Sequence, residues 1–294
     1  ERPGFDFCHR LLEREVITVS FLQYLINGIS IGAVYAIIAL GYTMVYGIAK
    51  MLNFAHGDII MVGAYISFSV TTYLNMSPYL SILVAMVGCV VLGVLIEALA
   101  YRPLRGAPSL AVLITAIGAS YFLQNAAQLI WGSDPKNFTS IVKFSPIKLF
   151  DGQVTITGEV LVTVATCVVI MIALVLFTEK TKIGKSMRAV SEDRDAAQLM
   201  GIHVNRTISV TFAIGSALAA IAGILLCSTV PTLQPTTGSM PGIRAFTAAV
   251  FGGIGSIPGA VVGAFISGLC EEVIKGLGYT TFSDAFTFAL LIVV

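Results

Sequence analysis

Long apolar segments alternate with short polar connections along the whole chain. The apolar runs cover residues 21–46, 59–73, 80–100, 110–130, 160–177, 208–230 and 245–274, and a last one begins near residue 282. Most of them reach the roughly 20 residues that an α-helix needs to cross about 30 Å of hydrocarbon. The pattern predicts an all-α polytopic membrane protein with about eight transmembrane helices, some of them broken by glycine-rich stretches.

Composition adds to this picture. The chain of 294 residues is 56% hydrophobic and 11% charged, and its mean hydropathy is +0.91. So many crossings leave no room for a separate soluble domain, so we expect one membrane domain in contact with the lipid bilayer. The formal net charge of +1 provides no basic stripe for phosphates, which argues against a nucleic-acid partner. The five scattered cysteines lack metal-ligand spacing, so we expect no metal site.

Basic residues indicate how the spans are oriented. Arg102 and Arg105 share one short connection, six lysines and arginines lie in the loop 179–206, and two spans separate them. Both connections therefore face the same side, which the positive-inside rule makes the cytoplasm. The connection 131–159 lies opposite, and its "GQVTIT" predicts a short strand. The side of the N-terminus stays open, because its arginines favour the cytoplasm whereas three full crossings before Arg102 favour the outside.

The loop 179–206 contains a charged stretch, "SEDRDAAQLMGIHVNRT", that predicts a short helix. Ser191 is a suitable N-cap, acidic residues fill the first turn, and Gly201 suits a left-handed stop. Such a helix is about 14 Å long and needs a partner surface, although an interfacial helix on lipid headgroups is an alternative. The candidate contact residues are Ser191, Glu192, Asp193, Asp195, Ala196, Ala197, Gly201 and Ile202.

The same loop does not predict nucleotide binding. Gly184, Lys185 and Ser186 resemble the end of a P-loop, but Glu179 stands where that motif needs its first glycine. A membrane span rather than a strand precedes them. We therefore expect no cofactor on this chain, and any nucleotide chemistry would belong to another chain.

A second stretch, "MVYGIAKMLNFAHGDIIMVGAYISF", interrupts an apolar passage with polar residues. Irregular polar backbone at membrane depth is tolerated only against protein or a water-filled cavity. This favours a broken helix beside a pathway, with Asn53, His56, Gly57 and Asp58 as candidates. Asp58 is expected to cap a helix beginning at Ile59, with a proton relay through His56 and Asp58 as the alternative.

A third stretch, "IRAFTAAVFGGIGSIPGAVVGAFISG", repeats this design late in the chain. Its "VGAFIS" echoes the earlier "VGAYIS", and each copy follows a broken segment, which predicts an internal duplication. Gly28 with Gly32 and Gly259 with Gly263 have the spacing of close helix contacts. The pathway candidates here are Gly252, Gly253, Gly255, Ser256 and Gly259.

Three ordered motifs carry a resemblance to a known family. The passage "NGISIGAVYAIIALGYTMVYGIAKMLNFAHGDIIMVGAYISF", the loop "GKSMRAVSEDRDAAQLMGI" and the late "AFTAAVFGGIGSIPGA" together resemble the membrane permease subunit of ABC importers for branched-chain amino acids. The similarity covers residues 21–294, whereas residues 1–20 do not match the family start and are treated as an N-terminal extension. The end of the final span is expected to be missing at residue 294.

The resemblance implies a mechanical role rather than an enzymatic one. Asp193, Ala196, Ala197, Gly201 and Ile202 match the family's coupling helix, which docks into the ATPase subunit. The resemblance further implies two ABC ATPase subunits that bind ATP and magnesium, and a second homologous permease subunit or a second copy. It also implies a periplasmic solute-binding protein at loops such as 131–159, and a place in the bacterial inner membrane. Other amino acids, amides or urea remain alternative substrates.

Two other classes of function stay open from the residues alone. A secondary transporter or channel would use His56, Asp58, Arg244 or Glu271 as ion-coupling or gating groups. An intramembrane enzyme would need a nucleophile with its base or a metal site. The sequence has no HExxH motif, and its GxSxG match at residues 28–32 lies inside an apolar run rather than at a strand-to-helix turn.

Overall fold

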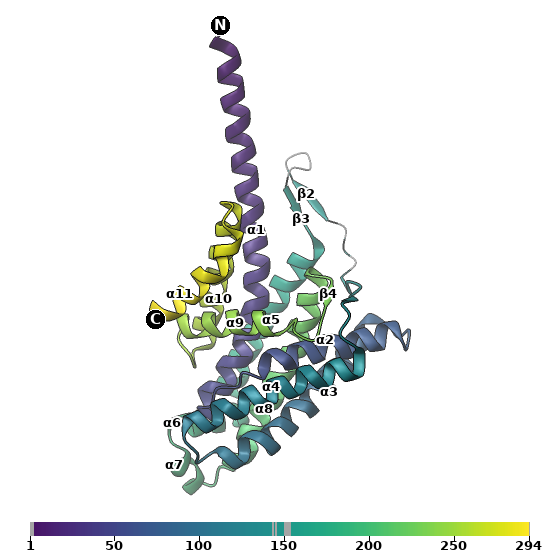
Figure 1. Cartoon of the computed structure of the whole chain (residues 1–294). Helices are drawn as coiled ribbons and strands as arrows, with labels where there is room; N and C mark the ends of the chain where they lie inside the picture. The colour runs from purple at the N-terminus through teal and green to yellow at the C-terminus, as the bar shows by residue number, and fades with distance from the viewer. Residues whose placement is uncertain (1–2, 143, 145, 150–153, 294) are drawn as a thin grey trace.

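Most of the apolar segments predicted from the sequence fold into helices with bounds within a few residues of the expected positions, but the first helix begins at Pro3 instead of residue 21 (Figure 1). The computed structural model describes residues 3–142, 144, 146–149 and 154–293. The α-helices are α1 Pro3–Ala49, α2 His56–Thr72, α3 Pro78–Ile96, α4 Ser109–Trp131, α5 Gly158–Lys180, α6 Lys182–Glu192, α7 Arg194–Leu199, α8 Val204–Thr229, α9 Ser239–Phe251, α10 Ile257–Gly276 and α11 Ser283–Val293. Shorter elements are a π-helical turn Glu97–Tyr101, 3-10 turns Arg102–Leu104 and Thr280–Phe282, and strands β1 Lys136–Asn137, β2 Ile147–Leu149, β3 Val154–Ile156 and β4 Thr232–Leu233.

Helix α1 is the central element of the bundle. In the most apolar 18-residue segment of this helix, 89% of the residues are buried. The helix packs along α10, α8, α5 and α9. Gly28 and Gly32 let α10 approach closely: a Cβ atom on Gly28 would lie 2.9 Å from the Cα of Leu269. The predicted helix contact at this glycine pair is confirmed, because small residues permit the backbone contact that drives helix association in lipid.

Helices α3, α4 and α5 form the outer part of the bundle. Only 22%, 22% and 17% of their most apolar windows are buried, and side chains such as Leu99, Phe122 and Leu129 are exposed. An apolar exposed helix surface of this extent matches hydrocarbon rather than water. Six helices of the described chain are long and apolar enough to cross a membrane.

Helices α2 and α9 are shorter than a full span and lie mostly inside the protein. Helix α2 has 17 residues and α9 has 13, so both fall short of the roughly 20 residues that a crossing requires. Helix α9 is separated from α10 by a turn in which Gly253 and Gly255 have φ of 91° and 101°. The predicted helix breaks before α2 and between α9 and α10 are thus confirmed. Both short helices, α2 and α9, pack against other helices of the bundle.

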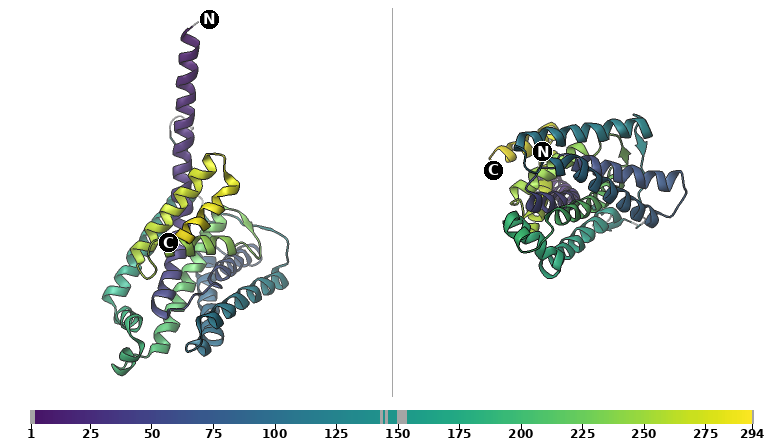
Figure 2. Two further views of the ribbon diagram at one scale, coloured as in Figure 1. Left: turned by 60° about the vertical axis from the view of Figure 1, so that its left-hand side comes forward. Right: turned by 90° about the horizontal axis from the view of Figure 1, so that it is seen from below.

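The two ends of the bundle differ in character (Figure 2). Helices α6 and α7 lie at one end, here called the basic end, together with Arg102 and Arg105. The opposite end carries antiparallel pairings of β1 with β4 and of β2 with β3. The strand predicted in "GQVTIT" is confirmed for Val154–Ile156, while residues 152 and 153 lie outside the described part.

The orientation of α1 follows from its contacts at both ends. Gln23 pairs with the backbone of Thr155 in β3, with N–O distances of 3.2 and 3.0 Å. The other end of α1, at Ala49, accepts a hydrogen bond from Arg194 of α7. The apolar part of α1 therefore begins at the end opposite to the basic end and runs toward it, so this span starts on the side opposite to Arg102.

Candidate functional site

The loop 179–206 forms two consecutive helices rather than one. Asp193, and not Ser191, caps the second: its Oδ1 accepts hydrogen bonds from the backbone of Asp195 at 2.9 Å and of Ala196 at 3.0 Å. Ser191 lies in the last turn of α6 and donates to the carbonyl of Arg188 at 2.7 Å. The prediction of Ser191 as N-cap is wrong, because residues 182–192 bury their own apolar side and stay helical up to the extended Asp193.

Helix α7 ends in a tip that points away from the bundle. Gly201 has a φ of 84° with open space around it, so the predicted left-handed stop is confirmed. The amide of Ile202 donates to the carbonyl of Ala197 at 3.0 Å and closes the turn. Ala197 is buried, whereas Leu199 and Met200 are 89% and 84% exposed. The tip thus presents two adjacent apolar side chains outside any span, a surface suited to a partner.

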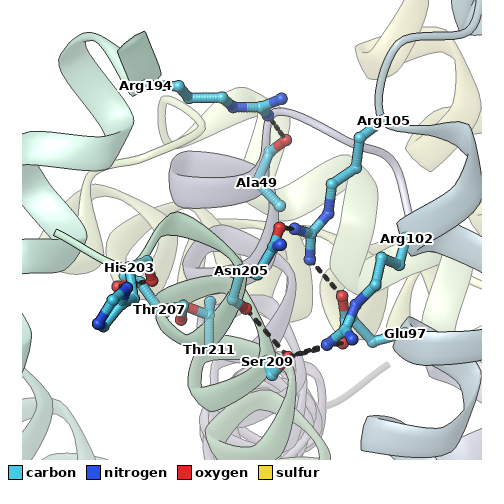
Figure 3. Close-up of polar contacts among 10 residues, drawn as sticks. All are labelled: Ala49, Glu97, Arg102, Arg105, Arg194, His203, Asn205, Thr207, Ser209 and Thr211. Carbon is cyan, nitrogen blue, oxygen red and sulfur yellow. Dashed lines mark hydrogen bonds and ion pairs between the residues drawn. The ribbon is translucent and has the colours of Figure 1, made fainter. Parts of the chain in front are cut away.

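Arg194 ties α7 directly to the central helix (Figure 3). Its guanidinium donates to the carbonyl of Ala49, the last residue of α1. The final carbonyls of a helix have no partner within the helix, and a cation near them is stabilised by the helix dipole. Arg194 therefore joins α7 to the end of α1 through a charge-assisted hydrogen bond.

A second connection joins α8 to the end of α3 (Figure 3). Glu97 begins the π-helical turn and is fully buried. It accepts a hydrogen bond from Ser209 of α8 at 2.7 Å and one from Arg102 at 3.3 Å, and it pairs with Arg105. Arg105 also donates to Asn205. The loop 179–206 is thereby linked to α1 on one side and, through α8, to α3 on the other.

Sequence reasoning missed Glu97 and used Arg105 only to orient the chain. The available signal was an acidic residue inside an apolar run, which demands a partner at membrane depth. Burial lowers the pKa of the Arg105 guanidinium, while the neighbouring Glu97 carboxylate acts in the opposite direction. The partner is found only in the fold, because Ser209 lies more than a hundred positions away in the chain.

The stretch around His56 is closely packed. Asn53 accepts a hydrogen bond from the hydroxyl of Tyr101 at 2.8 Å. The imidazole of His56 is buried with its centroid 4.6 Å from that of Tyr42, and its Nε2 has no hydrogen-bond partner among the described residues. The adjoining cavity, which Asn53 and His56 help to line, measures about 10 Å³. That volume is close to the minimum for one water molecule.

Asp58 connects three helices instead of capping one. Helix α2 begins at His56 and its N-terminus has no side-chain cap. The Asp58 carboxylate accepts a hydrogen bond from Gln124 of α4 at 2.9 Å, and Gln124 also donates to Ser239 of α9 at 3.2 Å. The predicted cap is wrong because the carboxylate faces α4, which supplies the donor that a buried charge needs.

The late glycine stretch lines an open cavity at the basic end. This cavity of about 220 Å³ lies between α1, α5, α6 and the turn before α10, and Gly47, Arg188, Ser191, Gly255 and Ser256 are among its walls. The structure therefore brings the late glycine stretch next to the loop 179–206, two features that the sequence treats separately. Gly252 and Gly259 do not line this cavity, because they lie against each other's backbone.

Comparison with known proteins agrees with this architecture. The family described as the permease component of the branched-chain amino acid transport system matches residues 24–294. The high-affinity branched-chain amino acid transport system permease protein LivH of Escherichia coli is 42% identical, covering 93% of this chain and 92% of the relative. BraD of Pseudomonas aeruginosa is also 42% identical with the same coverage. A probable LivH of Methanocaldococcus jannaschii is 30% identical over 87% of this chain and 84% of its own.

Family membership and the helical architecture lead to one conclusion. The match covers more than nine-tenths of the chain and includes the loop 179–206 and both glycine-broken stretches. The apolar spans give the same multi-pass arrangement. This chain is an ABC importer permease and belongs to the family of branched-chain amino acid permease components.

Proposed function

We propose that this permease moves branched-chain amino acids from the periplasm to the cytoplasm through the bacterial inner membrane. The names of LivH and BraD, which describe high-affinity transport of these amino acids, support the choice of substrate. The basic end then faces the cytoplasm and the strand-bearing end faces the periplasm. The chain itself makes and breaks no covalent bond in this scheme.

The observation that carries the coupling proposal is the hydrogen bond from Arg194 to the last carbonyl of α1. Helix α7 exposes Leu199 and Met200 to a partner, while Arg194 on the same helix holds α1. We assign α7 and its closing turn to docking in a cleft of an ABC ATPase subunit. Movement of that subunit is then transmitted to α1, which lines the cavity at the cytoplasmic end.

The complete transporter in this proposal has several subunits. Two ATPase subunits bind ATP and magnesium and supply the energy, and this chain pairs with a second homologous permease or a second copy of itself. A periplasmic solute-binding protein delivers the amino acid at the loops of the periplasmic end, in which β1 pairs with β4. Residues such as Phe144 and Ile147 in the connection 131–159 are exposed and available for that contact.

Substitution of Gly201 by tryptophan tests the docking of α7. Gly201→Trp places a large side chain with an unfavourable φ at the tip of the helix, where nothing else is disturbed. Gly132→Trp is a matched control, since Gly132 has a φ of 86° with open space around it at the periplasmic end. The permease is purified from native membranes in each form, and the co-purified chains are identified by mass spectrometry.

We expect P-loop ATPase chains with the unmutated protein and with Gly132→Trp, but not with Gly201→Trp. Equal recovery with Gly201→Trp would refute docking through α7. Absence of an ATPase from all three preparations would favour the alternative, an ion-coupled secondary transporter or channel. His56 and Asp58 would then be the first groups to test.

A further inference from the structure

A cluster of charged side chains lies deep in the bundle, away from the loop 179–206. Tyr35 belongs to it and lies near the middle of the 30-residue apolar part of α1, Ser20–Ala49. At 1.5 Å per residue it is about 20 Å along the helix from either end. Arg244 comes from the short helix α9, and Glu271 and Lys275 come from α10. Ionisable groups at this depth are costly and usually functional.

The cluster is organised around one carboxylate. Glu271 accepts hydrogen bonds from Tyr35 at 2.9 Å and Arg244 at 2.6 Å, and forms an ion pair with Lys275 at 2.8 Å. Arg244 also donates to Tyr35 at 2.9 Å and pairs with Asp284. A buried ion pair is a poor source of stability, because desolvation of the charges offsets their attraction. Packing alone therefore gives no reason to keep this network in an apolar bundle.

The network forms one wall of a cavity of about 210 Å³. The same cavity is also lined by aliphatic side chains, here called the aliphatic wall, which include Ile31, Val34 and Leu226. The volume has room for several water molecules or for a small solute.

A second cavity lies next to this site. It measures about 510 Å³, shares the lining residues Ile31 and Thr229 with the first cavity, and is also lined by Ser140 and Glu159. Ser140 and Glu159 lie in and beside the connection that carries β2 and β3. The first cavity is therefore separated from this periplasmic connection by a neighbouring cavity with polar lining residues.

We propose that the cavity between α1, α8, α9 and α10 binds the transported amino acid as a zwitterion. Arg244 and Lys275 bind its carboxylate, Glu271 binds its ammonium group, and the aliphatic wall holds its side chain. This assignment rests on the proposed function and adds to it the location of the substrate. The buried Nε of Arg244 has no acceptor among the described residues, so the guanidinium retains a donor for an incoming carboxylate.

Charge balance explains why a zwitterion fits this site better than other solutes. The wall offers two cations, Arg244 and Lys275, and one anion, Glu271; the cations also pair with Asp284 and Glu272, which do not line the cavity. A zwitterion offers a carboxylate to the cations and an ammonium group to Glu271 without changing the net charge of this network, whereas a simple anion or cation changes it by one.

Uptake of radiolabelled leucine by the complete transporter in proteoliposomes tests the site. Arg244→Gln and Glu271→Gln are expected to lower uptake at least tenfold. Val34→Phe keeps every charge but fills the aliphatic wall, and it is expected to lower leucine uptake at least tenfold and alanine uptake less. Tyr279→Phe is the control, because Tyr279 is exposed and lines neither of the two cavities. Its uptake should stay within threefold of the unmutated protein.

A binding measurement separates this inference from the proposed function. Leucine should raise the unfolding temperature of the unmutated permease complex, while leucinamide, which lacks the carboxylate, and isocaproate, which lacks the ammonium group, should not. Val34→Phe should abolish the shift. Uptake at the unmutated rate in Val34→Phe and Arg244→Gln would overturn the site and leave the proposed function standing. Failure of the unmutated transporter to move any amino acid would instead refute the proposed function.

Discussion

The two glycine-broken stretches look alike in the sequence but differ in the fold. Around residues 53–58 the chain is tightly packed: a Cβ atom on Gly57 would lie 2.7 Å from the carbonyl oxygen of Gly238, and the adjoining cavity holds about 10 Å³. Around residues 252–259 the chain turns with positive φ and lines a cavity of about 220 Å³. Glycine therefore serves close backbone approach in the first stretch, whereas the second stretch combines a close approach of Gly252 and Gly259 with a left-handed turn at Gly253 and Gly255.

The two stretches also differ in their contacts. The second stretch lines the same cavity as Arg188 and Ser191 of α6, which places it beside the loop 179–206. The first stretch holds α2, α4 and α9 together through Asp58 and Gln124. Two different surroundings thus share one sequence signature.

Gly57→Ala should have the largest effect on stability. The added methyl group meets the backbone of Gly238, which cannot move aside as a flexible side chain would. Overpacking of this kind costs about 3 kcal/mol or more, so little folded protein should survive detergent extraction and size-exclusion chromatography. Gly118→Ala is the control, because Gly118 lies in α4 with open space around it. A normal yield of Gly57→Ala would contradict the close packing assigned to the first stretch.

Tyr101→Phe should cost less, about 1–3 kcal/mol in the free energy of unfolding. The substitution removes the hydrogen bond to Asn53 and leaves that buried amide oxygen without its donor. Thermal unfolding of the purified permease measures the loss. Tyr279→Phe removes an exposed hydroxyl and should leave the unfolding temperature unchanged. Equal stability of the two variants would mean that Asn53 finds another partner.

Gly253→Ala should cost about 1–2 kcal/mol, since an L-residue with a side chain is strained at a φ of 91°. There is no steric clash, because the position opens into free space. Gly253→Asn should recover part of the loss, as asparagine adopts this conformation more readily. The same thermal unfolding assay ranks the three proteins. If the alanine and asparagine variants lost the same stability, the presence of a side chain, and not the backbone conformation, would be the cause of the loss at this position.

Asp58→Asn should have the smallest effect, below about 1 kcal/mol. Asparagine keeps an oxygen that accepts from Gln124, so the connection between α2 and α4 survives. Leucine uptake should remain within threefold of the unmutated rate. Complete loss of uptake in a folded and assembled Asp58→Asn protein would instead assign Asp58 to a proton relay and would make the first stretch part of the pathway.

Interpretation of the sequence worked best where one property recurs over many residues. Each apolar run contains so few polar residues that its hydropathy alone predicts a span. The basic residues in the two short connections likewise predicted that both connections lie on the same side. The left-handed Gly201 was also predictable, because a glycine just after a short helix is a common stop. Coupling and pathway roles stay predictions.

Single side chains were harder to place, because their partners are remote in sequence. Ser191 and Asp58 were both expected to cap helices, and both are engaged elsewhere. A cap depends on where the preceding helix ends and on which donors lie across from the carboxylate, and neither is encoded in a local pattern.

The sequence by itself determined that this is a polytopic helical permease with a charged, capped loop at one end, because burial in lipid requires long apolar runs and water-exposed helices require polar ones. Only the tertiary structure decided which polar groups meet. Glu97 pairs with Arg105 and Ser209, Arg194 reaches Ala49, and Arg244 reaches Glu271. In a low dielectric each charge must find its opposite, and packing of distant helices is what brings the two together.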